Sequence, residues 1–393
     1  MGLRGRPSHV REDRVGVMTT NRWLTAYAKA AKWSDIFVGR PDHARLIAAG
    51  LLGEAGSVLA EVKKRRREED VYPGYLDSLG EELGDSLWYF VRLADLVDRP
   101  LLKSIARERA RASRRPALNS ALDLGAAAGR IISALGLDER SALREALLAA
   151  WTALERVARA AGTSLEQAAD ENLRKTQNRW PRERARRDWP RPADYYPLFD
   201  SGVPPEDRLP RDLEIEFIER KRGARRQVVL RVNGINVGSR INDNITDADH
   251  YRYHDIFHLS YAVFLGWSPV IRDLLRCKRK SSPELDENQD GARAVIIEEA
   301  ISALVFSRAK HAHYFEGATQ VDYDLLKSIA EFVRGYEVEV VPVWQWERAI
   351  LEGFRVFHRL KSQHGGHVAL SLTRRTLQYR AMRRKPSGPV RKL

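Results

Sequence analysis

Two stretches of sequence decide the fold of the first half of the chain: LLGEAGSVLAEVKK, residues 51–64, and EELGDSLWYFVRLADL, residues 81–96. Their Leu, Val and Ala residues recur at intervals of three and four, which predicts amphipathic α-helices. Each stretch also carries carboxylates among its apolar residues, namely Glu54, Glu61, Glu82 and Asp85. These acids need a chemical reason, because an unpaired carboxylate is expensive to remove from water.

The spacing of the four acids predicts a cation site. Residues three, four or seven apart share one face of a helix, so Glu54 and Glu61 lie together, as do Glu82 and Asp85. If the two helices pack antiparallel, the acidic faces meet and a divalent cation is their natural counter-ion. Oxygen ligands favour Mg²⁺ or Mn²⁺. The alternative interpretation is a solvated acidic stripe, the usual fate of Glu pairs on a helix.

An internal repeat supports the cation interpretation. Residues 51–62 resemble residues 122–135, and residues 81–110 resemble residues 144–175. The second copy has lost the acids, and Ala126 stands where the first of them would be. The helical fold therefore does not itself require the carboxylates.

The acidic stretches resemble the MazG-like, all-α nucleoside triphosphate pyrophosphohydrolases, a family related to the dimeric dUTPases. The family signature is ExxE, a spacer and ExxD, and its four acids bind magnesium. Here the signature runs Glu54-Ala-Gly-Ser57, a spacer of 24 residues and Glu82-Leu-Gly-Asp85, so serine replaces one acid. Residues 162–181, GTSLEQAADENLRKTQNRWP, resemble the end of such domains, where an Asn and a Lys lie near the phosphates. The matching residues are Asn172 and Lys175.

The resemblance implies hydrolysis of a nucleoside triphosphate to the monophosphate and pyrophosphate, with one or two magnesium ions gripping the triphosphate and activating a water. The implied catalytic and metal-binding residues are Glu54, Glu61, Glu82 and Asp85, where Glu61 replaces the acid lost at Ser57; Glu81 is the alternative replacement. The implied substrate-binding residues are Lys63, Asn172 and Lys175. Sites of this family generally form between protomers, so a homodimer is expected, although a tandem pair could supply the interface within one chain.

The sequence changes character after residue 181. Residues 181–212 are rich in Pro and Arg without periodicity, which predicts a linker or an irregular wrap and a domain boundary. Residues 213–220 and 226–233 alternate and predict a hairpin, with an optional extension past the Asn233-Gly234 turn. Helices are expected at 247–265, 268–279, 290–312, 322–335 and 342–362.

Histidines and acids of the second half suggest another metal site. The first of these helices opens with a predicted capping box, Thr246 to Asp249, and His250, His254 and His258 follow at intervals of four. Candidate ligands of a second divalent metal are His254, Asp255, His258, Glu298 and Glu299. The alternative is a pair of core histidines hydrogen-bonded to the glutamates. The stretch 240–310 resembles the C-terminal domain that accompanies some MazG-like proteins.

Length and composition set the remaining expectations. At 393 residues the chain exceeds one hydrophobic core, and 43% hydrophobic with 31% charged residues is typical of soluble proteins. The sequence contains no uncharged apolar run of about 18 residues, so no membrane span is expected. The N-terminus lacks the apolar core of a signal peptide. The single cysteine, Cys277, excludes an internal disulfide, and the cytoplasm is the expected location.

The net charge of +14 has two interpretations. It reflects either solvated helix ends and linkers or attraction for polyanions, which means nucleotide phosphates or a nucleic acid. No zinc-finger, RRM or KH signature supports a nucleic acid as the partner.

We therefore expect a mainly all-α protein, with a tandem MazG-like helical bundle followed by a helical C-terminal domain that contains a small β-hairpin. The expected segments are a basic extension at 1–19, the tandem domain at 20–181 (acidic repeat 40–115, degenerate repeat 117–181), a Pro/Arg-rich linker at 182–212, the C-terminal domain at 213–380 and a basic tail at 381–393.

The leading functional hypothesis is a magnesium- or manganese-dependent pyrophosphohydrolase acting on an NTP, dNTP or modified nucleotide. One alternative is a non-catalytic nucleotide sensor or nucleic-acid-binding regulator, which would suit Ser57 and the acid-free repeat. The other is a metal-dependent phosphohydrolase that uses the C-terminal His/Glu cluster.

Overall fold

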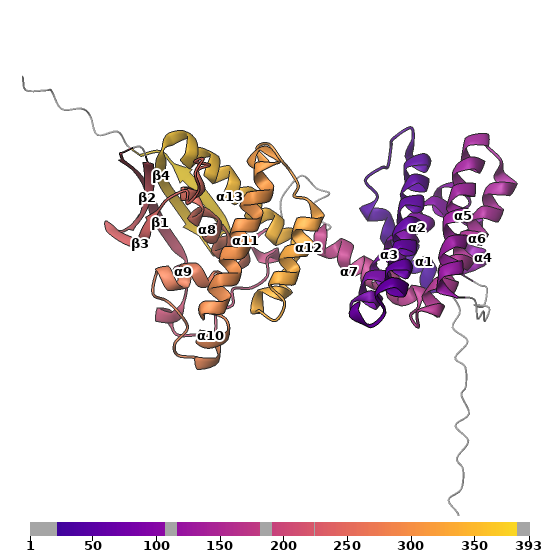
Figure 1. Cartoon of the computed structure of the whole chain (residues 1–393), viewed down its shortest axis with the longest axis horizontal. Helices are drawn as coiled ribbons and strands as arrows, with labels where there is room; N and C mark the ends of the chain where they lie inside the picture. The colour runs from indigo at the N-terminus through magenta and orange to yellow at the C-terminus, as the bar shows by residue number, and fades with distance from the viewer. Residues whose placement is uncertain (1–21, 107–115, 181–190, 224, 383–393) are drawn as a thin grey trace, which may run out of the picture. The chain divides into compact units, whose positions relative to one another are not determined.

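The structure is a computed structural model that describes residues 22–106, 116–180, 191–223 and 225–382. The predicted basic extension, most of the basic tail and residues 182–190 of the predicted linker lie outside the described residues. The chain divides into two compact units, residues 1–177 and 178–393 (Figure 1). The fold is mainly helical with a small antiparallel sheet near the C-terminus, which confirms the predicted fold class.

The first unit is a helical bundle. Its helices are α1 (Trp23–Ala31), α2 (His43–Glu68), α3 (Tyr75–Val97), α4 (Arg99–Ile105), α5 (Ala117–Leu137), α6 (Arg140–Ala160) and α7 (Leu165–Arg179). Helix α2 packs on α3 and α5, and α6 packs on α5 and α3. The core consists of the Leu, Val, Ile and Ala residues at the predicted three- and four-residue spacing.

Local chemistry accounts for several helix ends in this unit. Helix α2 ends in three arginines, Arg65–Arg67, whose charge suits the negative end of the helix dipole. The Asp98 carboxylate accepts a hydrogen bond from the Leu101 amide and so caps the N-terminus of α4, where Pro100 occupies the first turn.

Helix α5 is long and apolar enough, by length and composition, to cross a membrane. It packs against α2 and α6, however, and Leu124, Ala128 and Ile131 are fully buried in the bundle. The apolar residues of α5 therefore serve a helical core, which satisfies the same test.

A five-stranded antiparallel sheet is the framework of the second unit. Its strands run in the order β3-β2-β1-β4-β5. They are β1 (Asp212–Arg222), β2 (Arg225–Val232), β3 (Ile235–Ile241), β4 (Gly365–Ser371) and β5 (Thr376–Arg380). The predicted hairpin is confirmed, and so is its extension past Asn233 and Gly234, both of which have positive φ as a tight hairpin turn requires. The last two strands are not predicted.

The second unit also contains α-helices. They are α8 (Asp255–Leu265), α9 (Pro269–Leu274), α10 (Pro283–Asn288), α11 (Ala292–Lys310), α12 (Tyr323–Phe332) and α13 (Val343–Gln363). Helices α8 and α13 pack on each other and contact β4 and β5. Residues 191–211 form an irregular segment of the same unit and contribute Tyr195 and Leu209 to its core. That segment is a wrap on the second core.

The predicted start of the 247–265 helix is wrong. Helix α8 begins at Asp255, after a 3₁₀ turn over Tyr251–Tyr253. The Asp249 carboxylate accepts from the Tyr251 amide, two residues on, so it closes a local turn and not a capping box. His250 has a left-handed backbone, with φ 72°, which no continuous helix can contain.

Candidate functional site

Three carboxylates of the predicted cation site come together between α2 and α3. Glu54 lies on α2, and Glu82 and Asp85 lie one turn apart on α3. One carboxylate oxygen from each lies within 4.8 Å of the other two, and all three side chains are partly buried. Three like charges in so small a space repel one another unless a proton or a cation neutralises them.

The crowding of these acids shifts their protonation. Burial and the neighbouring Glu54 carboxylate raise the pKa of Glu82 to about 7. Burial and the nearby Asp85 charge raise the pKa of Glu54 as well. A cation bound among these oxygens would reverse both shifts, because it stabilises the ionised carboxylates.

Helix α7 brings a cation and an amide to the same acids. Lys175 Nζ lies 2.9 Å from the Glu81 carboxylate and also pairs with Asp85. Burial acts to lower the pKa of Lys175, but the Asp85 and Glu81 carboxylates outweigh it and hold the pKa above its usual value. The Asn172 amide donates to Asp85 Oδ1 at 2.7 Å, and its own oxygen accepts from the Tyr27 hydroxyl at 2.8 Å.

Two glycines on α3 allow α7 to approach closely enough for these contacts. A Cβ on Gly84 would lie 2.8 Å from the Ala168 carbonyl oxygen and 3.0 Å from Asn172 Cβ. A Cβ on Gly80, one turn earlier, would lie 3.1 Å from Glu171 Oε2. The sequence EELGD thus combines two acids of the cluster with the glycine that lets α7 dock beside them.

Other predicted residues of this site lie apart from the three acids. The Glu61 carboxylate accepts a hydrogen bond from the Tyr72 hydroxyl, and Glu61 does not belong to the group of close ligand atoms. Ser57 is half-buried on α2, and Lys63 is exposed on the same helix. Glu81, the alternative replacement for the lost acid, pairs with Lys175 and does not belong to the group of close ligand atoms. Tyr27 is a site residue that the sequence does not assign, and no sequence signal identifies it.

The second predicted cluster also assembles. His254 and His258 on α8 and Glu299 on α11 place one ligand atom each within 4.8 Å of the others. His258 Nδ1 lies 2.8 Å from Glu298 Oε1, and Asp255 lies 3.3 Å from His254 Nε2. The geometry therefore accommodates both alternatives that the sequence left open, a set of metal ligands and a hydrogen-bonded His–Glu pair.

The pKa values of the two histidines shift in opposite directions, because the carboxylates lie closer to His258, at 2.8 and 3.4 Å, than to His254, at 3.3 and 3.8 Å. Burial acts to lower the pKa of His258, but Glu298 and Glu299 outweigh it and raise that pKa to about 10. Burial lowers the pKa of His254. His250 lies apart from this cluster and hydrogen-bonds to Arg252.

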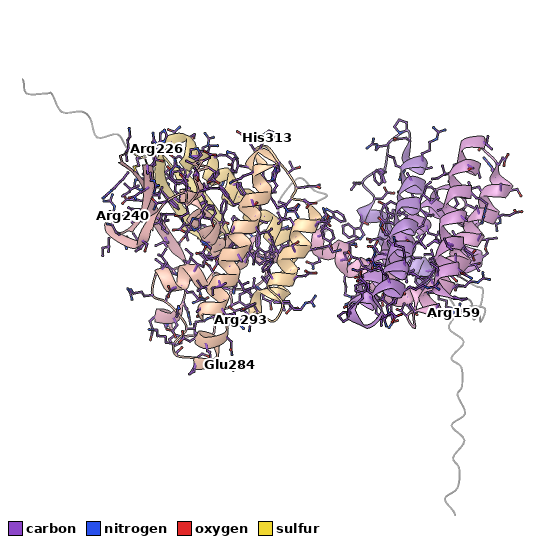
Figure 2. All side chains as sticks on the ribbon, viewed as in Figure 1. Arg159, Arg226, Arg240, Glu284, Arg293 and His313 are labelled. Atoms are coloured by element: carbon purple, nitrogen blue, oxygen red, sulfur yellow. The ribbon has the colours of Figure 1, made fainter. Side chains whose placement is uncertain are left out.

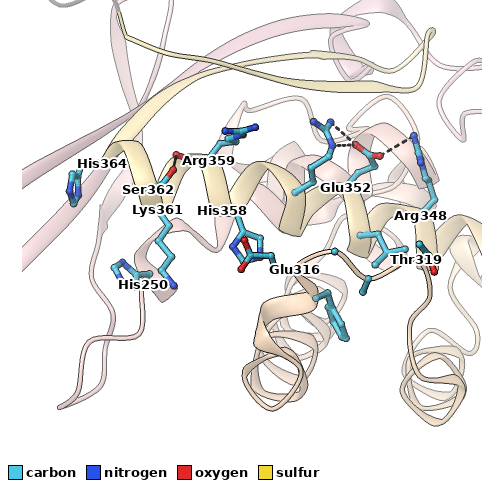
Figure 3. Close-up of a pocket in the computed structure, with 15 residues that line it drawn as sticks. His250, Glu316, Thr319, Arg348, Glu352, His358, Arg359, Lys361, Ser362 and His364 are labelled. Atoms are coloured by element: carbon cyan, nitrogen blue, oxygen red, sulfur yellow. Dashed lines mark hydrogen bonds and ion pairs between the residues drawn. The ribbon is translucent and has the colours of Figure 1, made fainter.

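A basic cavity of about 1050 Å³ lies elsewhere in the second unit, between α13 and the loop at 315–319 (Figure 3). The cationic side chains that line it are Arg348, Arg355, Arg359 and Lys361. Glu352 pairs with Arg348 at 3.0 Å and with Arg355 at 2.6 Å. Three consecutive residues at the edge of this loop, His313–Phe315, have left-handed backbones.

Comparison with known proteins identifies the C-terminal half of the chain. The family model of the MazG C-terminal domain matches residues 194–383. The Gene 37 protein of Mycobacterium phage L5 is 41% identical over 79 residues, which cover 18% of this chain and 69% of the phage protein. No solved structure matches the chain significantly.

The chain belongs to the MazG-like family and carries a MazG-type C-terminal domain. The resemblance of residues 240–310 to that domain is thereby confirmed. Membership points to an activity of the nucleotide pyrophosphohydrolase type.

Proposed function

We propose that the protein is a magnesium- or manganese-dependent nucleotide pyrophosphohydrolase that converts an NTP, dNTP or modified nucleotide to the monophosphate and pyrophosphate. The observation that carries this proposal is the convergence of Glu54, Glu82 and Asp85 beside Lys175. In the reaction a water oxygen bonds to the α-phosphorus and the water gives up a proton to solvent, while the bond from that phosphorus to the bridging oxygen breaks and pyrophosphate leaves with the electron pair.

The chemistry of the donor set fits a hard divalent cation. All three donors are carboxylates, whose oxygens Mg²⁺ and Mn²⁺ prefer. Burial, and after it the neighbouring Glu54 and Asp85 carboxylates, raise the pKa of Glu82, and a bound cation would offset both effects. When bound there, the ion supplies neutralisation of the triphosphate charge and activation of a water.

The side chains of α7 have two separate tasks in this proposal. Lys175 places a positive charge at the edge of the cluster, where it would stabilise charge that develops on the departing pyrophosphate. Asn172 uses both polar ends of its amide within the protein, on Asp85 and Tyr27. We therefore assign Asn172 a positioning role for Asp85, in place of the phosphate contact that the resemblance implies.

The test is hydrolysis by the purified full chain, with a panel of nucleotides and either Mg²⁺ or Mn²⁺, following pyrophosphate and phosphate separately. Glu82→Gln and Asp85→Asn should each lower turnover by at least about 100-fold, since each removes a charged ligand. Glu145→Gln, an exposed acid on α6, should leave turnover unchanged. Near-normal turnover of a folded Glu82→Gln protein would place the activity elsewhere, and no hydrolysis across the panel would refute the enzyme.

The basic cavity beside α13 favours polyanion binding as a second candidate function. Four cationic side chains line it against two acids, Glu316 and Glu352. The left-handed run His313–Phe315 is a costly conformation, which occurs disproportionately at functional sites. Binding of a labelled oligonucleotide should weaken steeply with salt and should weaken further in Arg359→Glu. Binding that is insensitive to both would exclude the cavity as the site.

A further inference from the structure

One ring nitrogen of His258 is hydrogen-bonded to a carboxylate, and the other has no hydrogen-bond partner among the described residues. Its ring is fully buried, and Nδ1 lies 2.8 Å from Glu298 Oε1, so Nδ1 carries the proton of that hydrogen bond. Nε2 is buried without a hydrogen-bond partner among the described residues. Its nearest carboxylate oxygen, Glu299 Oε2, is 3.4 Å away, which is long for a hydrogen bond. A buried polar atom left in this way calls for an explanation, and a bound ligand is one.

The glutamate that fixes His258 is itself fixed. Glu298 is fully buried and accepts from the Ser268 hydroxyl at 2.6 Å and from the Val270 amide at 2.8 Å. A carboxylate held by three donors cannot turn toward another partner. It therefore sets the orientation and tautomer of His258, as carboxylates behind metal-binding histidines do.

His254 repeats the same arrangement one helical turn earlier. Its Nδ1 lies 3.0 Å from the Tyr251 carbonyl oxygen, which can only accept, so Nδ1 carries the proton. The ring stacks on the Tyr251 ring at 4.3 Å, which holds its plane. His254 Nε2 then faces Asp255 Oδ1 at 3.3 Å and Glu299 Oε2 at 3.8 Å.

These separations suit a metal ion. Ligands about 2.0–2.1 Å from a tetrahedral metal lie about 3.3 Å apart. The contacts between a histidine nitrogen and a carboxylate oxygen of this cluster are 3.3, 3.4 and 3.8 Å long, so each is within a sub-ångström adjustment of that spacing. The Glu299 side chain is 43% exposed, whereas that of His258 is fully buried, so the site opens to solvent on one side.

We propose that the C-terminal unit binds one divalent transition-metal ion through His254 Nε2, His258 Nε2 and Glu299, with Asp255 as a further ligand. Two imidazoles with carboxylates favour Zn²⁺, Mn²⁺ or Fe²⁺ over Mg²⁺. The competing occupant of His258 Nε2 is a proton shared with the carboxylates. A proton there would face Glu299 Oε2 at 3.4 Å, a long contact for a hydrogen bond, and a metal ion would have to displace it.

The experiment uses the full chain carrying Glu82→Gln, so that the acidic cluster of the first unit contributes less metal binding. The protein is stripped with EDTA, dialysed, and titrated with Zn²⁺ and with Co²⁺, whose d–d absorption reports nitrogen ligands. One equivalent should bind and raise the melting temperature. His254→Gln and Glu299→Gln leave the His258–Glu298 pair in place, and each should weaken binding at least about tenfold, as loss of a ligand does.

His250→Gln is the matched control, because His250 has the same spacing along the chain but lies outside the cluster. It should bind metal like the parent protein. Binding below a tenth of an equivalent, with melting unchanged by Zn²⁺ or EDTA, would overturn the metal site and leave a buried hydrogen-bonded pair. Equal binding by the parent and by Glu299→Gln would overturn the assigned ligands.

Discussion

The docking of α7 on α3 can be tested at one glycine. In Gly84→Ala the new Cβ would lie 2.8 Å from the Ala168 carbonyl oxygen and 3.0 Å from Asn172 Cβ, so α7 must move away by several tenths of an ångström. Overpacking of this kind costs about 1–3 kcal/mol. The better helix propensity of alanine returns about 1 kcal/mol. We therefore expect a net loss of up to about 2 kcal/mol.

The same movement of α7 should also lower the rate of hydrolysis. Asn172 and Lys175 both hold Asp85 from α7, and the Asn172 bond is 2.7 Å long, so a shift of the helix lengthens it beyond useful range. Misplacement of a site by about 1 Å can cost about 100-fold in rate. We expect turnover of Gly84→Ala to fall by about 10- to 100-fold.

Gly125→Ala on α5 is the matched control, because nothing lies within 4 Å of a Cβ at that position. It should be more stable by up to about 1 kcal/mol and should keep its turnover. The measurements are thermal or urea unfolding and pyrophosphate release at saturating metal. If Gly84→Ala behaves like Gly125→Ala in both, the close contact of α7 does not position the site. The unfolding measurement still tests the packing of α7 on α3 if the protein proves inactive.

Three further outcomes are expected. Ser57→Glu should tighten magnesium binding. Glu61→Gln should change magnesium binding little, because the Glu61 carboxylate accepts a hydrogen bond from a tyrosine. The dependence of the rate on metal concentration measures both effects. The raised pKa of Glu82 should make the metal-free protein less stable as pH rises from about 4.5 to about 7, and Mg²⁺ should remove that trend in pH-dependent melting. Arg279→Met removes the cation that Asp290 and Glu337 share and should cost about 3–5 kcal/mol in urea unfolding, with Lys280→Met as an exposed control.

The acidic helices are predictable because their information is local. The apolar period defines α2 and α3, and the three- and four-residue spacing places the acids on common faces. The position of α7 is not local, since Asn172 and Lys175 meet Asp85 across 87 and 90 residues of sequence. In the sequence, α7 follows the acid-free repeat. In the folded unit, its packing at Gly84 brings it beside the acids.

The strands at the end of the chain escape sequence analysis for a different reason. Gly365 and Gly366 directly follow α13 and resemble a loop. A Cβ on Gly365 would lie 2.3 Å from the Phe217 carbonyl oxygen, and a Cβ on Gly366 would lie 2.2 Å from the Tyr379 ring. The glycines are needed because β4 lies between β1 and β5 with a backbone and a ring against it. The partner strand β1 lies about 150 residues earlier in the sequence, so no local pattern reveals this requirement.

The positive charge of the chain divides between structural and exposed side chains. Arg252, Arg272 and Arg279 are buried in the second unit and each pairs with at least one carboxylate. Exposed cations such as Arg240 and Arg293 lie on its surface (Figure 2). Buried, paired arginines cannot attract a polyanion, so these three contribute to the net charge without supporting nucleic-acid binding. Any affinity of this unit for phosphates must come from its exposed cations, and the cavity beside α13 is where several of them converge on one space.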